Sequence, residues 1–479
     1  MDRFRNFIGG GYADPRSGDW IPVYEPASGE QYAEVAASDA DDVDAAVAAA
    51  RDAFPAWAAL SGVERGRLLE RVAQGIEDRL DELVALESRD SGKPEALAQR
   101  VDIPRAALNF RFYGAAASQF ASESHPGPGA VNFTLRNPVG VAGCISPWNL
   151  PLYLFTWKLV PALAAGCTVV AKPSEWTPAT ATRVAAIARD AGLPDGVLNV
   201  VHGLGAQAGR ALVEHPDVPA VTFTGGTKTG ADIAGRAAPA FKRLSLELGG
   251  KNPTIVFADC DFDAAVAGAL RAAFANQGEI CLCGSRILVE RPVYERFRDA
   301  FVAGARKLRV GDPRDADTDV GALVSEPHYR KVLGYLDLAR EEGGRVLCGG
   351  EALELPGRLA GGWFVGPTVV DGLGNDCRTN QEEIFGPVAT LIPFDGEDEA
   401  LELANGVRYG LAASLWTQNG SRALRVAERL QAGLIWVNCW MLRDLRTPMG
   451  GVKDSGLGHE GGFDSMRFFT DARNVCLKY

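Results

Sequence analysis

The sequence predicts an α/β protein with two doubly wound, Rossmann-like domains built on parallel sheets, together with a small β arm. From 138 to 250, and again from about 253 to 440, apolar runs of β type alternate with helical stretches. That alternation indicates βαβ units in a parallel sheet with helices on both faces. The chain has 479 residues. Because one domain commonly holds about 100–200 residues, this length indicates two or three domains.

The predicted elements follow one another in a regular order. An acidic, Ala-rich pattern predicts a helix from near Asp41, and two more helices are predicted at about 62–90 and 94–117. The Pro/Gly-rich segment at 121–130 breaks this helical region, and VNFTLRN after it predicts a hairpin or an edge strand. The strands predicted next are VGVAGCIS, CTVVAK, VLNVV, AVTFT and LSLEL in the first block, then PTIVFA, SRILVE, ATLIPF, AASLWT and GLIWVN in the second.

The composition argues against several classes of function. The formal net charge of −12 opposes a nucleic-acid partner and an anionic membrane surface. No run approaches the roughly 18 apolar residues of a bilayer span, and the first residues show no signal or transit peptide. The nine cysteines are scattered and odd in number. We therefore expect free thiols and a location in the reducing cytoplasm.

One pair of cysteines lies within NQGEICLCGSR at 276–286. Cys281 and Cys283 are two residues apart, with an acid at Glu279 and small residues around them. A structural zinc site needs four ligands, yet the chain offers no second cysteine pair and no zinc-like spacing among its five histidines. We therefore predict no metal at this pair, and a disulfide partner or a thiol nucleophile stays open for its two sulfurs.

Two glycine-containing turns are candidates for binding a dinucleotide. GLGAQAG at 203–209 matches the G-x-G-x-x-A variant between a predicted strand and a helix, but no acid suited to a ribose clearly follows. A plain strand–helix turn is the alternative. The better candidate is FTGGTKTG at 223–230, where Gly225 and Gly226 allow close approach and the helix start offers free N–H groups to an anion.

Several polar residues stand where predicted strands end. Lys172 and Glu175 in AKPSEWTP would face the ligand crevice, and a carboxylate there favours NAD over NADP; a solvated surface pair is the alternative. Glu247 in LSLELGGKNP suits a general base, or else a cap or surface acid. Asn149 in ISPWNLP suits an oxyanion donor, or else a turn. With Cys281 they suggest a nucleophile, a base and an amide donor around one pocket.

Taken together, ISPWNLP, KPSE, FTGGT, LELGGKNP, NQGEICLCGSR and EEIFGPV resemble the aldehyde dehydrogenase superfamily, in its order and over essentially the whole chain. The resemblance implies Cys281 as nucleophile, Glu247 as base, Asn149 as oxyanion donor and NAD as cofactor. The implied cofactor contacts are Ser146, Trp148, Lys172, Ser174, Glu175, Gly225, Gly226, Glu383 and Phe385. Glu279 replaces the commoner Gln, and Cys283 is read as a lining residue or a redox partner.

The resemblance also implies an organisation of the chain. Residues 1–119 and 140–249 are expected to form the NAD-binding domain, and 250–450 the catalytic domain. Residues 120–139 and 465–479 are expected to form an arm that joins subunits into a homodimer or homotetramer.

Within that superfamily, NQGEICLC, SPWNLPLYLFTWK and NCWMLRDLRTPMGG are most similar to 2-aminomuconic and 2-hydroxymuconic semialdehyde dehydrogenases. Their substrates carry a carboxylate, which an arginine fork binds well. Arg105 and Arg443 are the predicted contacts. The alternative is that they form structural ion pairs with Asp102 or Asp444.

Other assignments stay open. Arg100 and Arg446 are the reserve substrate contacts. The substrate is otherwise another small aldehyde, such as succinic semialdehyde or betaine aldehyde, although a betaine-type cation fits poorly beside two arginines. A non-catalytic binding or structural protein on the same scaffold is the remaining alternative, which the intact Cys281, Glu247 and Asn149 oppose.

Overall fold

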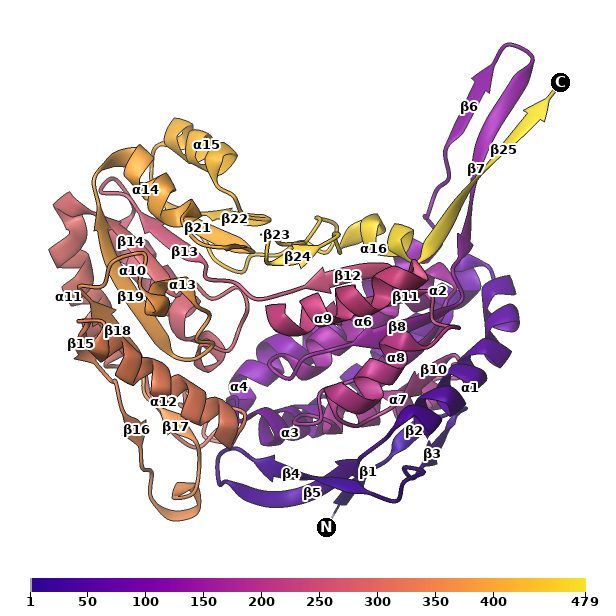
Figure 1. Ribbon diagram of the computed structural model, residues 1–479, viewed down its shortest axis with the longest axis horizontal. Helices are drawn as coiled ribbons and strands as arrows, with labels where there is room; N and C mark the ends of the chain where they lie inside the picture. Colours follow the sequence, from indigo (N-terminus) through magenta and orange to yellow (C-terminus); the bar gives the residue numbers. More distant parts are fainter. Residues whose placement is uncertain (1) are drawn as a thin grey trace.

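The computed structural model describes residues 2–479. Figure 1 shows two α/β bodies side by side, with a β arm that projects from the first. This arrangement confirms the predicted fold class. The domain boundaries drawn from the sequence stay a prediction.

The first body is built on an eight-stranded sheet that is parallel at its centre. Its strands, in spatial order, are β24 (Gly456–Leu457), β12 (Arg243–Glu247), β11 (Ala220–Thr224), β8 (Val141–Ile145), β9 (Thr168–Lys172), β10 (Leu198–Val200), β2 (Asn6–Ile8) and β3 (Gly11–Ala13). The strands from β12 to β10 are parallel to one another, whereas β24, β2 and β3 are antiparallel to their neighbours.

Helices cover both faces of this sheet because alternate side chains point to opposite faces. Val169 and Ala171 pack into one core with the helices α2 (Gly62–Glu77), α3 (Leu80–Ser91), α5 (Ile103–Ala117), α6 (Pro151–Ala165) and α7 (Ala179–Asp190). Val170 and Val221 pack into the opposite core with α1 (Ala40–Ala59), α8 (Arg210–Glu214) and α9 (Thr227–Ala237). The sheet is therefore doubly wound.

The second body repeats the plan on a seven-stranded sheet. Its strands, in order, are β15 (Arg345–Cys348), β18 (Thr368–Asp371), β19 (Val388–Phe394), β14 (Arg286–Glu290), β13 (Pro253–Val256), β21 (Ala412–Trp416) and β22 (Leu434–Val437), of which only β15 is antiparallel. One face packs on α10 (Phe262–Phe274) and α11 (Tyr294–Ala305), and the other on α14 (Gly396–Asn405) and α15 (Gly420–Arg429). The helices α12 (Glu326–Glu341) and α13 (Arg378–Gln381) also lie in this part of the chain, whereas α16 (Gly462–Phe468) packs into the first core through Met466.

The arm is a separate three-stranded sheet in which β7 (Ala130–Pro138) lies between β6 (Ser124–Gly127) and β25 (Thr470–Lys478). β25 is antiparallel to β7 along its whole length, from Thr470 opposite Pro138 to Lys478 opposite Ala130. In Figure 1 the arm points away from both bodies and ends near the C-terminus. The strand predicted from VNFTLRN therefore pairs with the far end of the chain.

The N-terminal region differs from the sequence-based expectation. Residues before the first predicted helix form β1 (Asp2–Phe4), β4 (Trp20–Glu25) and β5 (Glu30–Ala36), which make a small sheet, as well as β2 and β3. The helix predicted over 62–90 is two helices, and the one over 94–117 starts as the short α4 (Glu95–Leu97) and a π-type turn over 98–102 before α5. Short minor pairs β16 (Ala352–Leu353) with β17 (Phe364–Val365), and β20 (Tyr409–Gly410) with β23 (Val452–Lys453), lie outside the main sheets.

Local signals explain the ends of the helices that frame the site. Ser61 and Glu64 form a reciprocal capping box at the start of α2. α3 ends at Gly92, whose φ of +75° is left-handed and suits glycine. The turn after it brings Lys93 back into the interior, where its side chain is fully buried.

None of the helices in the described residues is long and apolar enough to cross a membrane. All nine cysteines are free thiols.

Candidate active site

A cavity of about 250 Å³ lies where strand ends of the first sheet meet loops of the second body. It is reached from β8, β11 and β12 on one side and from the segment before β14 on the other. Ligands of open parallel sheets bind at such carboxyl ends. The residues predicted from the sequence that line it are Trp148, Asn149, Gly225, Gly226, Cys281, Glu383 and Phe385.

A strained turn presents Cys281 to the cavity. Just after α10 in the chain, the residues Asn276, Gln277 and Gly278 have φ values of +52°, +56° and +72°. Three consecutive left-handed residues are costly unless the surroundings hold them. The Asn276 amide helps to do so, because its Nδ2 donates to the carbonyl of Glu279 at 3.2 Å.

The two cysteines of the pair have different surroundings. Cys281 is half-buried and lines the cavity, whereas Cys283 is buried in the hydrophobic core and is not among the cavity-lining residues. Asn252 Nδ2 donates to both backbone carbonyls, at 2.7 Å and 2.9 Å, and so fixes the segment. Burial, followed by the nearby carboxylate of Glu247, raises the pKa of the Cys281 thiol. The two sulfurs therefore differ in their access to the cavity, which only Cys281 of the pair lines.

Glu247 ends β12 in an almost fully buried position. Its two carboxylate oxygens have no hydrogen-bond partner within residues 2–479. Burial, followed by the charge of Glu460, raises the pKa of Glu247 to about 8. Glu460 itself is paired with Lys158 at 2.5 Å. A buried carboxyl with free oxygens and a pKa near neutrality has the properties of a general base.

Asn149 follows β8 and precedes α6. Its side-chain Nδ2 donates to the backbone carbonyl of Glu279 at 2.8 Å. An amide nitrogen carries two hydrogens, so one remains for a ligand in the cavity that Asn149 and Cys281 both line. This bond also fixes which end of the amide is the nitrogen.

The predicted cofactor contacts form two groups. Lys172 and Glu175 lie at the end of β9, outside the cavity, and are 3.3 Å apart. Lys172 Nζ also donates to the carbonyl of Pro173 at 2.9 Å, and Ser174 Oγ accepts from the backbone N–H of Trp176 at 3.3 Å. Ser146 Oγ is buried, with no partner in the part of the chain that the structure describes.

The second group lies at the cavity itself. Glu383 accepts a hydrogen bond from the backbone N–H of Gly250 at 2.9 Å. Phe385 has a left-handed φ of +64° and packs edge-on against Trp148, with ring centroids 5.2 Å apart. The Cβ of a side chain at Gly226 would meet nothing within 4 Å, and α9 begins after it without a side-chain cap. Its first N–H groups are thus available to an anion.

Sequence reasoning missed some residues of the cavity. His328, Lys331 and Trp176 also line it. His328 Nε2 lies 2.6 Å from the carbonyl of Phe385, to which it donates, and 3.5 Å from the Glu279 carboxylate. Burial, followed by the charge of Lys331, lowers the pKa of His328 to about 4. No sequence motif marks His328, because its contacts come from residues far away in the chain.

Arg105 on α5 and Arg443 in the loop after β22 converge on one aromatic ring. Their guanidinium carbons lie 5.7 Å and 5.6 Å from the ring centroid of Trp157. Arg105 also lies over Tyr153 at 4.9 Å, and its Nε donates to Asn109 at 3.2 Å. Burial, followed by the charge of Arg443, lowers the pKa of Arg105.

Neither arginine has a carboxylate partner in residues 2–479. Asp102 instead contacts Lys93 at 3.1 Å, and Asp444 pairs with Arg446, whose Nε lies 3.0 Å from it. The structural ion pairs considered from the sequence are therefore absent from the described chain. The reserve candidates Arg100 and Arg446 are exposed.

Comparisons with known proteins show the family of this chain. The family model described as "Aldehyde dehydrogenase family" matches residues 12–475. A protein of Danio rerio named 2-aminomuconic semialdehyde dehydrogenase is 50% identical, over 99% of this chain and 98% of its own. A Pseudomonas sp. (strain CF600) protein named 2-hydroxymuconic semialdehyde dehydrogenase is 48% identical over 100% of both.

Solved structures are similar to this chain along its whole length. PnpE from Pseudomonas sp. WBC-3 is 44% identical, covers 100% of this chain and 98% of its own, and superposes with a TM-score of 0.97. The same values hold for PnpE in complex with nicotinamide adenine dinucleotide. The chain belongs to the aldehyde dehydrogenase family.

Proposed function

We propose that this protein is an NAD-dependent dehydrogenase that oxidises a carboxylate-bearing semialdehyde, of the 2-aminomuconic or 2-hydroxymuconic type, to the dicarboxylic acid. The observation that carries the substrate class is the pair of arginines over Trp157 without a carboxylate partner in residues 2–479. The names of the relatives from Danio rerio and Pseudomonas support the same substrate class.

Buried N–H groups on both arginines and on Trp157 lack acceptors within residues 2–479. Arg105 Nη2, Arg443 Nε and Trp157 Nε1 are buried N–H groups with no acceptor in the described chain. Such groups are uncommon in proteins, because an unmet buried donor costs free energy. A substrate carboxylate supplies several acceptor sites and a matching negative charge. The same pair repels a cationic substrate such as betaine aldehyde.

For the first half of the reaction, Cys281 acts as the nucleophile. Its sulfur bonds to the aldehyde carbon after losing its proton, because the thiolate is the reactive form. The carbonyl oxygen then becomes an anion, to which the free N–H of Asn149 donates. NAD, when bound, supplies the acceptor for the hydride that leaves the same carbon. A thioester on Cys281 results.

For the second half, Glu247 acts as the general base. Its free carboxylate oxygens take a proton from water, and the hydroxide equivalent attacks the thioester carbon. The carbon–sulfur bond breaks, which releases the acid and restores Cys281. Retention of this base favours hydrolysis over transfer of the acyl group to a second thiol.

The residues present suit the cofactor. The uncapped start of α9 and the open space at Gly226 offer a place for a pyrophosphate. Glu175 suits a ribose diol and disfavours a 2′-phosphate. Glu383 and Phe385, at the cavity, are the proposed contacts for the nicotinamide end.

Kinetics with matched variants test the substrate class. Purified protein with NAD and 2-hydroxymuconic semialdehyde is followed by NADH formation, for wild type, Arg105→Ala and Arg443→Ala. Each substitution is expected to lower kcat/KM by about 2–4 kcal/mol in transition-state free energy. Arg446→Ala is the control, since this exposed arginine pairs with Asp444. Rapid oxidation of an uncharged aldehyde, with both variants unchanged, would assign the arginines to structure.

The arm supports a proposal about assembly and location. Its strands carry exposed Leu135 and Leu477, and β6 leaves one edge unpaired in the described chain. Apolar side chains beside an open strand edge favour association. We therefore expect a homodimer or homotetramer formed through the arm. The nine free thiols suit the cytoplasm.

A further inference from the structure

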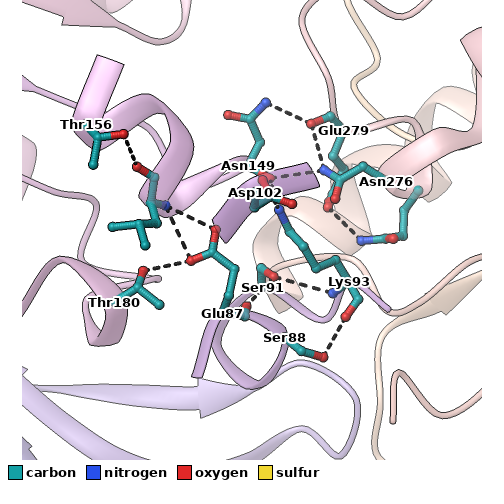
Figure 2. A network of polar contacts seen from close by, with 12 residues as sticks. Glu87, Ser88, Ser91, Lys93, Asp102, Asn149, Thr156, Thr180, Asn276 and Glu279 are labelled. Atoms are coloured by element: carbon teal, nitrogen blue, oxygen red, sulfur yellow. Dashed lines mark hydrogen bonds and ion pairs between the residues drawn. The ribbon is translucent and has the colours of Figure 1, made fainter. Parts of the chain in front are cut away.

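A buried polar network holds the backbone of Asn149 (Figure 2). Lys93 Nζ donates to the carbonyl of Asn149 at 3.0 Å, and Asn276 Nδ2 donates to the same oxygen at 3.1 Å. The side chain of Asn149 is tied at its other end to the Glu279 carbonyl at 2.8 Å. Both ends of this residue are therefore fixed, by Lys93 on one side and by the segment 276–279 on the other.

Lys93 is held firmly where it makes this bond. Its side chain is fully buried and contacts the fully buried Asp102 at 3.1 Å. Its backbone carbonyl accepts from Ser88 Oγ at 2.6 Å. A buried ion pair pays a large desolvation cost and is weak support for stability by itself. Its presence beside Asn149 points to a role in placing that residue.

Glu87 fixes the backbone three residues further on, at Leu152. Its carboxylate accepts from the backbone N–H of Leu152 at 3.1 Å, in the first turn of α6, and from Thr180 Oγ1 at 2.7 Å. Burial raises the pKa of Glu87 to about 7, against the effect of Lys93. Lys93 thus binds the backbone of Asn149 before Pro151, and Glu87 binds the backbone of Leu152 after it. These two contacts restrict the position of Asn149.

We infer that Lys93, paired with Asp102, is a positioning residue that sets where the Asn149 amide meets the developing oxyanion. The inference rests on the function proposed above, because it acts through Asn149. Lys93 is not among the residues that line the cavity, so its effect on the rate would pass through Asn149. A displacement of about 1 Å in such a donor is enough to cost up to about 100-fold in rate.

The test removes the bond of Lys93 together with the charge of its partner Asp102. The double variant Lys93→Met/Asp102→Asn keeps the side-chain sizes and neutralises both partners. It is expected to fold with a similar Tm and to lower the rate of the NADH burst about tenfold or more, with KM for NAD unchanged. Lys93→Arg, which keeps a donor and the charge, is expected to recover part of that loss if it folds.

A double-mutant cycle separates positioning from general stability. If Lys93 acts through Asn149, the double variant adds little further loss in an Asn149→Ala background. An equal loss in both backgrounds would overturn the inference. As a matched control, Arg345→Met/Asp371→Asn neutralises an ion pair in the second sheet and should leave the burst rate unchanged.

The oxyanion role of Asn149 and the positioning role of Lys93 are overturned by different results. An Asn149→Ala enzyme as fast as wild type would remove the oxyanion role of Asn149 and with it the role of Lys93. An impaired Asn149→Ala enzyme beside a fully active Lys93→Met/Asp102→Asn enzyme would overturn the inference on Lys93 alone. The proposed function would then stand.

Discussion

Cys281 and Glu247 are both held toward their uncharged forms by burial, and the carboxylate of Glu247 further raises the pKa of the Cys281 thiol. A charge on one is unfavourable for a charge on the other because they share a poorly solvated site. The two groups therefore suit successive steps, in which the thiolate reacts first and the carboxylate accepts a proton later.

This coupling leads to a prediction for Glu247. Hydrolysis needs the ionised form of Glu247, whose pKa is about 8. We therefore expect kcat to be low at pH values well below 8, where the carboxyl is protonated, and to increase as the pH rises through 8. Glu247→Gln should still give a burst of about one NADH per site, then almost stop. Stopped-flow and steady-state rates over pH check this, with Cys281→Ala, which should give no burst, as control. Steady turnover by Glu247→Gln at the wild-type rate would contradict the assignment.

At the scale of elements, the turn over 276–278 has three consecutive residues in the left-handed region. It links α10 to Cys281, the proposed nucleophile, and Gly278 has a φ of +72°. A Cβ at Gly278 would collide with the backbone carbonyl of Gly386. The turn therefore depends on glycine at this position, and the placement of Cys281 depends on the turn.

We accordingly predict that Gly278→Ala destabilises the protein by about 1–3 kcal/mol and slows alkylation or acylation of Cys281. The matched control is Gly235→Ala within α9, where a Cβ meets nothing within 4 Å. It should leave Tm unchanged or slightly higher, since alanine favours a helix interior. Thermal melts and iodoacetamide labelling of both variants check this. A Gly278→Ala protein with normal Tm and labelling would show that the turn is not constrained.

At the scale of the whole molecule, the arm stands apart from both bodies (Figure 1). The long strands of the arm are β25 and β7, and most side chains of β25 are exposed. Leu135 is 42% exposed and Leu477 is 57% exposed. An extended sheet of this kind is stable when another surface covers it.

We therefore predict that Leu135→Glu/Leu477→Glu weakens self-association. Light scattering after size-exclusion chromatography should give a smaller mass than wild type at equal concentration, with the secondary structure kept. Leu424→Glu, on α15 and 69% exposed, is the control and should leave the mass unchanged. A monomeric wild type, or an unchanged mass for the double variant, would exclude the arm as the contact.

Periodicity and motifs determined much about this protein without coordinates. Alternating strands and helices predicted the doubly wound class, because local hydrophobic spacing follows the faces of each element. The family resemblance predicted Cys281 rather than Cys283 as the nucleophile, and the strand ends predicted Asn149 and Glu247 as its neighbours in the site. The five N-terminal strands and the break within 62–90 were missed, because short strands and exposed turns carry weak local patterns.

Only the tertiary structure decided the partners of the charged residues. The sequence placed Arg105 near Asp102 and Arg443 near Asp444, so local ion pairs were reasonable. Folding instead directs Asp102 to Lys93 and brings both arginines to Trp157. The Lys93 contact with Asn149 arises in the same way. Such contacts join segments far apart in the chain, and which of them form depends on how whole elements pack rather than on neighbouring residues.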